Sequence, residues 1–209
     1  MKIGIIGSGN MGSGLGKIWA KKGHEVIFSY SRNQEKLAGL AASVLHAKAG
    51  TPAEAAHADV ILLSVRWPDL PDALRQAGSL NNRIVIDCTN PLKPDLSGLE
   101  LGYTTSAAEE IARMAPGAKV VKAFNTAFAQ VYEEHSRLFG SRRASMLYCS
   151  DDAEAKSVVA KLITDVGFDP VDCGPLSAAR LLEPVAMLMI TLGYSMKMGT
   201  NMALDLIRR

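Results

Sequence analysis

A glycine-rich turn near the start of the sequence is the motif with the clearest chemistry. It has the spacing GxGxxG and directly follows an apolar run, Lys2 to Ile6. In such a turn the first glycine allows the tight bend, the second lets the backbone approach a pyrophosphate, and the third lets helix and strand pack closely. Free N–H groups at the start of the following helix then favour the anion. The predicted pyrophosphate site consists of Gly7, Ser8, Gly9, Asn10, Met11 and Gly12.

The residues after the second apolar run, His24 to Tyr30, indicate which dinucleotide binds. Folds that bind NAD usually carry an acid here, about 20 residues past the glycines, which bonds the ribose hydroxyls. This chain has Ser31, Arg32 and Asn33 instead. Arg32 can pair with a 2′-phosphate in a bidentate manner, Ser31 can donate a hydrogen bond, and Lys36 adds charge one helical turn later. The alternative is a solvated helix start, but basic side chains are not what a helix N-terminus prefers. The sequence therefore favours NADP.

Three later strand ends carry further candidate residues. In an open α/β sheet, ligands bind at the carboxyl ends of strands near the topological switch point. Trp67 could cover the cofactor or its partner ring, or equally seal the end of the sheet. Asn90 and Asn125 could bond the nicotinamide carboxamide or serve as ordinary turn residues. The three strand ends are Ser64 to Pro68, Cys88 to Leu92 and Ala123 to Thr126.

The sequence contains no Ser/His/Asp set, no paired catalytic carboxylates and no histidine cluster with metal spacing. Hydride transfer between two cofactor rings suits such a site, because it needs positioning and exclusion of water more than an acid or base. We therefore expect no catalytic side chain and no metal ion. The three cysteines, Cys88, Cys149 and Cys173, have no CxxC spacing, so neither a disulfide framework nor a zinc site is predicted.

Apolar runs alternate with segments of helical period, which predicts an α/β fold of the Rossmann type with a doubly wound, mostly parallel sheet. The expected strands are Lys2 to Ile6, His24 to Tyr30, Asp59 to Val65, Arg83 to Cys88 and Lys119 to Phe124, with later short strands at Ala144 to Ser150 and Pro170 to Cys173. The expected helices are Gly12 to Lys22, Gln34 to Ser43, Ala53 to His57, Ser106 to Met114 and Ala153 to Gly167. We expect residues 1–175 to form the NADP-binding domain. Residues 176–209 should form a mostly helical tail that covers the site, pairs two subunits, or both.

Composition is that of an ordinary globular protein: 48% of the 209 residues are hydrophobic, 21% are charged and the formal net charge is +2. This argues against disorder and against a surface for nucleic acid. The N-terminal run lacks the features of a signal peptide. No apolar run approaches the roughly 18 residues of a membrane span, since Leu181 to Leu192 contains Glu183 and Pro184. We expect a cytoplasmic protein without a membrane partner, and a homodimer because the tail has more apolar surface than it can bury on itself.

Together these motifs resemble the NADPH-dependent reductases of the deazaflavin coenzyme F-420 (F420), the coenzyme F420:NADP oxidoreductase family. The resemblance spans nearly the whole chain and rests on Gly7 to Gly12, Ser31-Arg32 with Lys36, Trp67, Lys119 to Thr126, and Cys173 to Ser177 with Arg180 and Glu183. It implies that Ser8 to Gly12 lie at the pyrophosphate, that Ser31, Arg32 and Lys36 lie at the 2′-phosphate, and that the region around Val65, Asn90 and Ala129 lies near the nicotinamide. It also implies a C-terminal helical segment that screens the site.

The electron acceptor stays open at this point. Archaeal members of that family tend to carry a histidine where this chain has Asn125, and related domains serve membrane metalloreductases in which a flavin relays electrons to ferric iron. F420, FMN, FAD and iron are therefore all candidate acceptors. The 3-hydroxyacid dehydrogenases and pyrroline-5-carboxylate reductases start similarly, but their long helical second domain does not fit the residues from Leu176 onward. The sequence predicts an NADP(H)-dependent oxidoreductase, with a reductase of a small carbonyl or imine substrate and a non-catalytic NADP sensor as alternatives.

Overall fold

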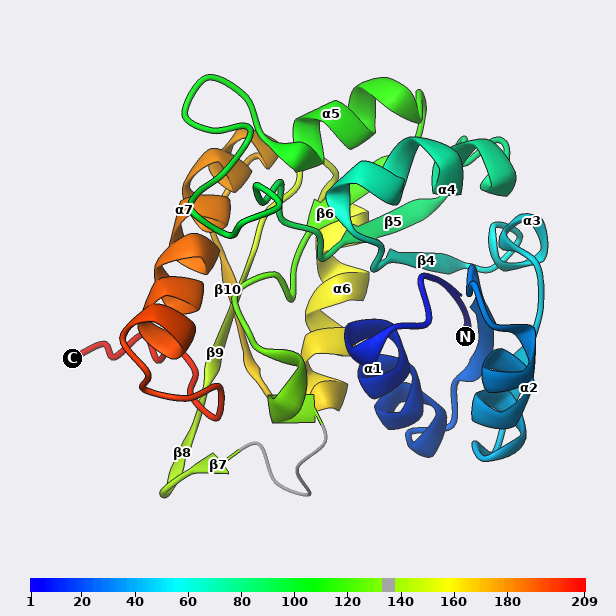
Figure 1. Cartoon of the computed structure of the whole chain (residues 1–209), viewed down its shortest axis with the longest axis horizontal. Helices are drawn as coiled ribbons and strands as arrows, with labels where there is room; N and C mark the ends of the chain where they lie inside the picture. Colours follow the sequence, from blue (N-terminus) through cyan, green and yellow to red (C-terminus); the bar gives the residue numbers. More distant parts are fainter. Residues whose placement is uncertain (133–137) are drawn as a thin grey trace.

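The core of the protein is a six-stranded parallel sheet in the order β3-β2-β1-β4-β5-β6 (Figure 1). The computed structural model describes residues 1–132 and 138–209. The strands are β1 Lys2–Ile6, β2 Glu25–Ser29, β3 Ala47–Ala49, β4 Val60–Leu63, β5 Ile84–Asp87 and β6 Lys119–Lys122. This order is that of the doubly wound dinucleotide fold, in which β1 and β4 flank the switch point. The predicted Rossmann-type α/β class is confirmed.

Helices cover both faces of the sheet, as Figure 1 shows, and each layer has its own apolar core. The helices of one layer are α1 Asn10–Lys21, α2 Gln34–Ala42 and α6 Ala153–Val166. Those of the other layer are α3 Pro52–Ala55, α4 Leu70–Ala77, α5 Ala107–Met114 and α7 Ala179–Ile190. Short helical turns follow three of the strands, namely η1 Trp67–Asp69, η2 Ala129–Tyr132 and η3 Leu176–Ala178. The π-turn η4, Thr191–Ser195, continues from the end of α7.

Side-chain caps fix where four of these helices begin. Asn33 accepts a hydrogen bond from the third residue of α2, Ser106 does the same for α5, and Asp152 does so for α6. Thr51 and Glu54 form a reciprocal capping box at α3. Each cap satisfies N–H groups that a helix start would otherwise leave unpaired. These caps therefore fix the residue at which each of the four helices begins.

A second, smaller sheet extends the first beyond β6. Its strands β9, Ser145–Tyr148, and β10, Asp169–Asp172, run parallel to each other. An antiparallel bridge between Lys122 and Cys149 joins this pair to the main sheet. A short hairpin of β7 Leu138–Phe139 and β8 Arg142–Arg143 precedes it.

The C-terminal segment differs from the prediction. Residues 196–209 contain no helix, although residues 176–209 were predicted to be mostly helical. Gly199 has a φ of 86°, which a helix does not allow. The backbone N–H of Ser145 donates to the carbonyl oxygen of Leu204 at 2.8 Å. This segment bonds to the β9 strand rather than to itself, and that pairing overrides its helical pattern.

The helical part of the tail ends at Ser195 and is more apolar than predicted. Leu176–Ser195 forms 20 helical residues with a mean hydropathy of 1.4, which is enough to cross a membrane by length and composition alone. Glu183 and Pro184 were expected to keep the apolar run shorter than a membrane span, but both lie inside α7 and the 20-residue helix passes the length and hydropathy criteria with them included. Glu183 is fully buried and carries its charge into the protein interior, where it meets Lys122.

Candidate functional site

The three glycines of the first turn have different surroundings. Gly7 has a φ of 109°, and a Cβ added there would lie 2.6 Å from the carbonyl carbon of Ser64. A Cβ on Gly12 would meet the carbonyl oxygen of Gly7. By contrast, no described atom lies within 4 Å of the Cβ position of Gly9. The fold itself requires glycine at positions 7 and 12. At Gly9 the missing side chain instead leaves free space beside the backbone.

The start of α1 is a bare helix N-terminus. Gly9 is the N-cap residue and, as a glycine, has no side chain that could cap the helix. The first turn of α1 carries no acidic residue. The first N–H groups of a helix have no partner inside the helix, and the helix dipole makes this end positive. The Ser8 hydroxyl donates to the carbonyl oxygen of Ser29 at 2.8 Å and holds the turn against β2. An open backbone beside unpaired N–H groups fits a diphosphate.

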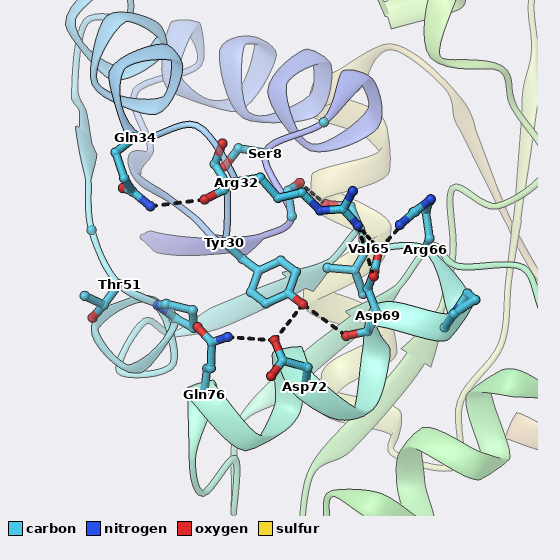
Figure 2. A pocket seen from close by; sticks show the side chains of 17 residues that line it. Ser8, Tyr30, Arg32, Gln34, Thr51, Val65, Arg66, Asp69, Asp72 and Gln76 are labelled. Carbon is cyan, nitrogen blue, oxygen red and sulfur yellow. Dashed lines mark hydrogen bonds and ion pairs between the residues drawn. The ribbon is translucent and has the colours of Figure 1, made fainter.

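This turn opens into a cavity of about 690 Å³ at the ends of β1, β2 and β4 (Figure 2). That volume is in the range of small-molecule and cofactor sites. The predicted site residues that line it are Gly7, Ser8, Gly9, Ser31, Arg32 and Val65. The structure thus places the glycine turn and the residues after the second strand on one cavity, although more than 20 positions separate them in the sequence.

A polar wall closes the side of the cavity next to α4. Tyr30 has a φ of 55°, and its hydroxyl donates to Asp72 Oδ2 at 2.9 Å (Figure 2). Burial and the Asp72 carboxylate raise the pKa of Tyr30 to about 12, so the phenol stays protonated at neutral pH. Gln76 also donates to Asp72, at 2.7 Å. Because both donors bond to the Asp72 carboxylate, its negative charge is hydrogen-bonded within the wall.

Ser31 and Arg32 occupy the rim of the cavity, as the NADP prediction requires. The Ser31 hydroxyl donates to the carbonyl oxygen of Asn33 at 2.9 Å. The Arg32 side chain is 81% exposed, and its Nη2 donates to Asp69 Oδ1 at 3.3 Å. Lys36 is exposed on the first turn of α2 and does not line the cavity. Its role at the 2′-phosphate therefore stays a prediction.

Other predicted site residues lie away from this cavity. Trp67 is partly buried at the start of η1 and packs against the core under α4 and α5. Ala129 opens η2, which lies against α1. The predicted residues outside the cavity lining are Asn10, Met11, Gly12, Lys36, Trp67, Asn90, Asn125 and Ala129. The assignment of the last four of these to the nicotinamide region stays a prediction.

Asn90 and Asn125 pair with each other across the ends of β5 and β6. Asn90 Nδ2 donates to the backbone oxygen of Asn125, and Asn125 Nδ2 donates to Asn90 Oδ1 and to the carbonyl oxygen of Leu182, each at 3.1 Å. Asn125 is 5% exposed, and its Oδ1 has no partner among the described residues. Buried polar atoms are normally hydrogen-bonded, so this oxygen is an acceptor whose partner is not among the described residues.

A buried ion cluster lies beneath the same strand ends. Lys122 is fully buried, and its Nζ lies 2.8 Å from Asp87 Oδ2 and 2.8 Å from Glu183 Oε1. Burial alone would lower the pKa of Lys122, but the two carboxylates outweigh burial and raise it. Burial is also the main reason why the pKa of Glu183 is raised. Glu183 Oε2 accepts from the N–H of Ala107 at the start of α5, so the cluster ties α7 to both sheet and helix.

Sequence reasoning missed two groups of residues here. It assigned no role to the wall and rim residues Tyr30, Arg66, Asp69, Asp72 and Gln76. It also missed the cluster of Lys122, Asp87 and Glu183. A usable signal existed for the second group, because a lysine at the end of the apolar run that forms β6 needs a buried counter-charge.

Comparison with known proteins identifies the family. The family model described as NADP oxidoreductase, coenzyme F420-dependent, matches residues 2–91. The F420-dependent NADP reductase of Methanothermobacter thermautotrophicus is 32% identical over 210 residues, which cover 92% of this chain and 89% of that protein. The chain belongs to this reductase family. It is an NADP-dependent oxidoreductase, and NADP(H) is its nucleotide.

Other relatives carry different names. A candidate F420-dependent NADP reductase from Arthrobacter sp. FB24 has a crystal structure that matches with a TM-score of 0.88 at 29% identity, covering 100% of both chains. Metalloreductase STEAP3 of Rattus norvegicus is 32% identical over 98% of this reductase, which spans 40% of that longer protein. A reductive aminase from Aspergillus terreus, solved with NADPH, shares the fold at a TM-score of 0.68 and 21% identity, and covers 94% of this chain and 62% of its own.

Proposed function

We propose that this reductase transfers hydride between NADPH and the deazaflavin coenzyme F420. The observation that carries the proposal is the cavity that joins the open backbone of Gly9, the bare start of α1 and the rim residue Arg32. The Methanothermobacter relative supports the acceptor, because the similarity extends over nearly all of both chains and because that protein is named for F420.

The residues of this chain would position the nucleotide rather than react with it. NADPH, when bound, supplies the hydride itself, so the protein contributes binding, orientation and exclusion of water. The first N–H groups of α1 would hold the diphosphate, and Arg32 would pair with the 2′-phosphate. The unpaired Oδ1 of Asn125, at the ends of β5 and β6, would accept a hydrogen bond from the carboxamide.

The proposal is tested by offering the purified protein NADPH together with F420, FMN, FAD or a ferric chelate in turn. Oxidation of NADPH is followed by the loss of its near-ultraviolet absorbance. We expect turnover with F420, and slower or no turnover with the others. Absence of turnover with F420, while NADPH still binds, would contradict the proposed acceptor.

A flavin-dependent metalloreductase activity is the second candidate. It is favoured by the similarity to STEAP3, which extends over 98% of this chain. Turnover with FMN, FAD or ferric chelate and none with F420 would select it. Tight binding of NADPH without any oxidation would instead favour an NADP sensor or a carbonyl or imine substrate.

Replacement of Arg32 by alanine tests the nucleotide preference. A hydrogen bond to a charged group contributes roughly 1.5–3 kcal/mol, so Arg32→Ala should weaken NADPH binding by about that amount. NADH has no 2′-phosphate and should be affected far less. Titration calorimetry with both nucleotides measures the difference, and Arg142→Ala serves as control because this exposed arginine pairs with Asp205 away from the cavity. Equal losses for NADPH and NADH would exclude the 2′-phosphate role.

We further propose that the protein is a homodimer that pairs through α7. Leu181 and Leu188 are exposed on α7, and Met196 and Met198 are exposed just after it. Leu181 and Leu188 are two helical turns apart and therefore share one face of α7, and a contiguous exposed apolar patch is typical of an interaction surface. Light scattering at micromolar concentration should give the mass of two chains, and a monomer mass would count against the pairing.

A further inference from the structure

Two arginines from different strand ends meet at one carboxylate on the rim of the cavity. Arg32 follows β2 and Arg66 follows β4, and these strands lie on opposite sides of β1. Arg66 Nε donates to Asp69 Oδ2 at 2.8 Å, and Arg32 Nη2 donates to Asp69 Oδ1 at 3.3 Å. Figure 2 shows both guanidinium groups converging on Asp69. The fold thus brings to this rim a second arginine, Arg66, to which the sequence analysis assigned no role.

The pair of arginines has donors and charge left over. Asp69 offsets only one of the two positive charges, and its pKa is held below the ordinary value chiefly by the Arg66 hydrogen bond. A guanidinium carries five N–H donors, and Arg66 gives only its Nε–H to Asp69. The Arg66 side chain is 70% exposed and lines the same cavity as Arg32. Most of its donors are therefore available to a second anion.

We propose that Arg66 is a second ligand of the 2′-phosphate, beside Arg32, and a determinant of the preference for NADP over NAD. The proposal rests on NADP binding in this cavity. A phosphate monoester presents three acceptor oxygens and up to two negative charges, more than one guanidinium can satisfy. Asp69 acts as the positioning residue, because it holds Arg66 and Arg32 side by side on the rim.

Two other roles for Arg66 are outcomes of the test. Arg66 and Asp69 lie three residues apart on the surface, and such a pair on its own contributes little to stability and nothing to binding. A guanidinium can also stack on an aromatic face, here that of adenine. If Arg66 stacks on adenine, it strengthens the binding of NADPH and NADH alike. If Arg66 binds the 2′-phosphate, it strengthens only the binding of NADPH.

The experiment measures dissociation constants for four probes by titration calorimetry. NADPH is compared with NADH, and adenosine 2′,5′-bisphosphate is compared with adenosine 5′-monophosphate. The proteins are the wild type, Arg66→Ala and the control Arg113→Ala, which removes another exposed arginine paired three residues away, with Glu110, outside the cavity lining. Thermal unfolding of each variant shows whether the fold is intact.

Arg66→Ala should raise the dissociation constants of NADPH and of adenosine 2′,5′-bisphosphate by about tenfold or more, as expected for a hydrogen bond to a charged group. The constants for NADH and adenosine 5′-monophosphate should stay within about twofold. The control should change none of the four. An equal rise for all four probes would overturn the proposal in favour of stacking, and no rise would leave Arg66 a surface pair.

A second variant separates direct contact from neutralisation of Asp69. If Arg66 only offset the charge of Asp69, then adding Asp69→Asn to Arg66→Ala would restore NADPH affinity, and this would overturn the ligand role. We expect no restoration. Wild-type protein that binds neither NADPH nor adenosine 2′,5′-bisphosphate would refute NADP binding in this cavity and this proposal together. A wild-type preference for NADPH that Arg66→Ala leaves intact would refute only this proposal.

Discussion

Gly9→Ala is expected to abolish tight NADPH binding while leaving the fold almost unchanged. The Cβ position of Gly9 meets no described atom within 4 Å, and its φ of −73° is allowed for alanine. The new methyl group would instead occupy the space through which the backbone approaches the diphosphate. Losing one or two charge-assisted hydrogen bonds there should weaken NADPH by about 3 kcal/mol, or roughly a hundredfold, in titration calorimetry.

Two further variants control this experiment. Alanine is a poorer N-cap than glycine, so Gly9→Ala should lower the melting temperature by only about 1–3 °C. Gly39→Ala is the matched control, because Gly39 in α2 also has open space at its Cβ position but lies outside the cavity lining. It should keep NADPH affinity and gain up to about 1 kcal/mol of stability. Gly7→Ala should instead disrupt folding, since its Cβ would clash with Ser64. Unchanged NADPH affinity in Gly9→Ala would remove the glycine turn from the site.

Lys122→Met should destabilise the folded protein strongly. The change leaves Asp87 and Glu183 as buried carboxylates without their shared cation. Removing one partner of a buried ion pair costs roughly 3–5 kcal/mol. Urea unfolding at neutral pH measures the loss. Lys119→Met is the matched control on the same strand, and it should cost less than about 1 kcal/mol because Lys119 pairs with Glu154 at the surface.

The pH dependence of this loss has a definite sign. The pKa of Glu183 is raised above 4.5 in the folded protein, chiefly by burial, so the folded state holds its proton to a higher pH than the unfolded chain does. Stability from this group therefore falls as pH rises above 4.5 toward the folded pKa. Without Lys122 the pKa rises further, so the deficit of Lys122→Met should be smaller in mildly acidic buffer than at neutral pH. A deficit that grows on acidification would contradict this cluster.

Local patterns explain why much of the fold was predictable. The first strand, the glycine turn and the helix after it depend on residues close in sequence, and the predicted strand Lys2–Ile6 is confirmed to the residue. The strand Ala47–Ala49 was not predicted, because three residues with two alanines carry no β propensity. Residues 196–209 were predicted wrongly because their backbone pairs with a strand about 60 positions earlier, and no local pattern reveals such a pairing.

The same distinction between local and long-range contacts separates the site residues that were predicted from those that were missed. Arg32 was found because its distance from the glycine turn is fixed by one strand and one helix. Arg66 was overlooked because its meeting with Arg32 depends on β4 lying beside β1, which only the sheet order decides. The ion pair of Glu183 was overlooked, since its partner Lys122 lies 61 positions away and the two meet only in the folded chain.

The pairing of the C-terminal segment with β9 also bears on the solubility of the protein. An unpaired strand edge can add strands from other molecules and so start aggregation. The segment around Leu204 and Leu206 occupies the hydrogen-bonding groups of Ser145 on that strand, through a backbone bond of 2.8 Å and a side-chain bond of 2.9 Å. Arg142 adds an ion pair with Asp205 beside them. These C-terminal residues occupy hydrogen-bonding groups at this end of β9. We therefore expect the segment after the helical tail to limit edge-to-edge strand pairing between folded molecules.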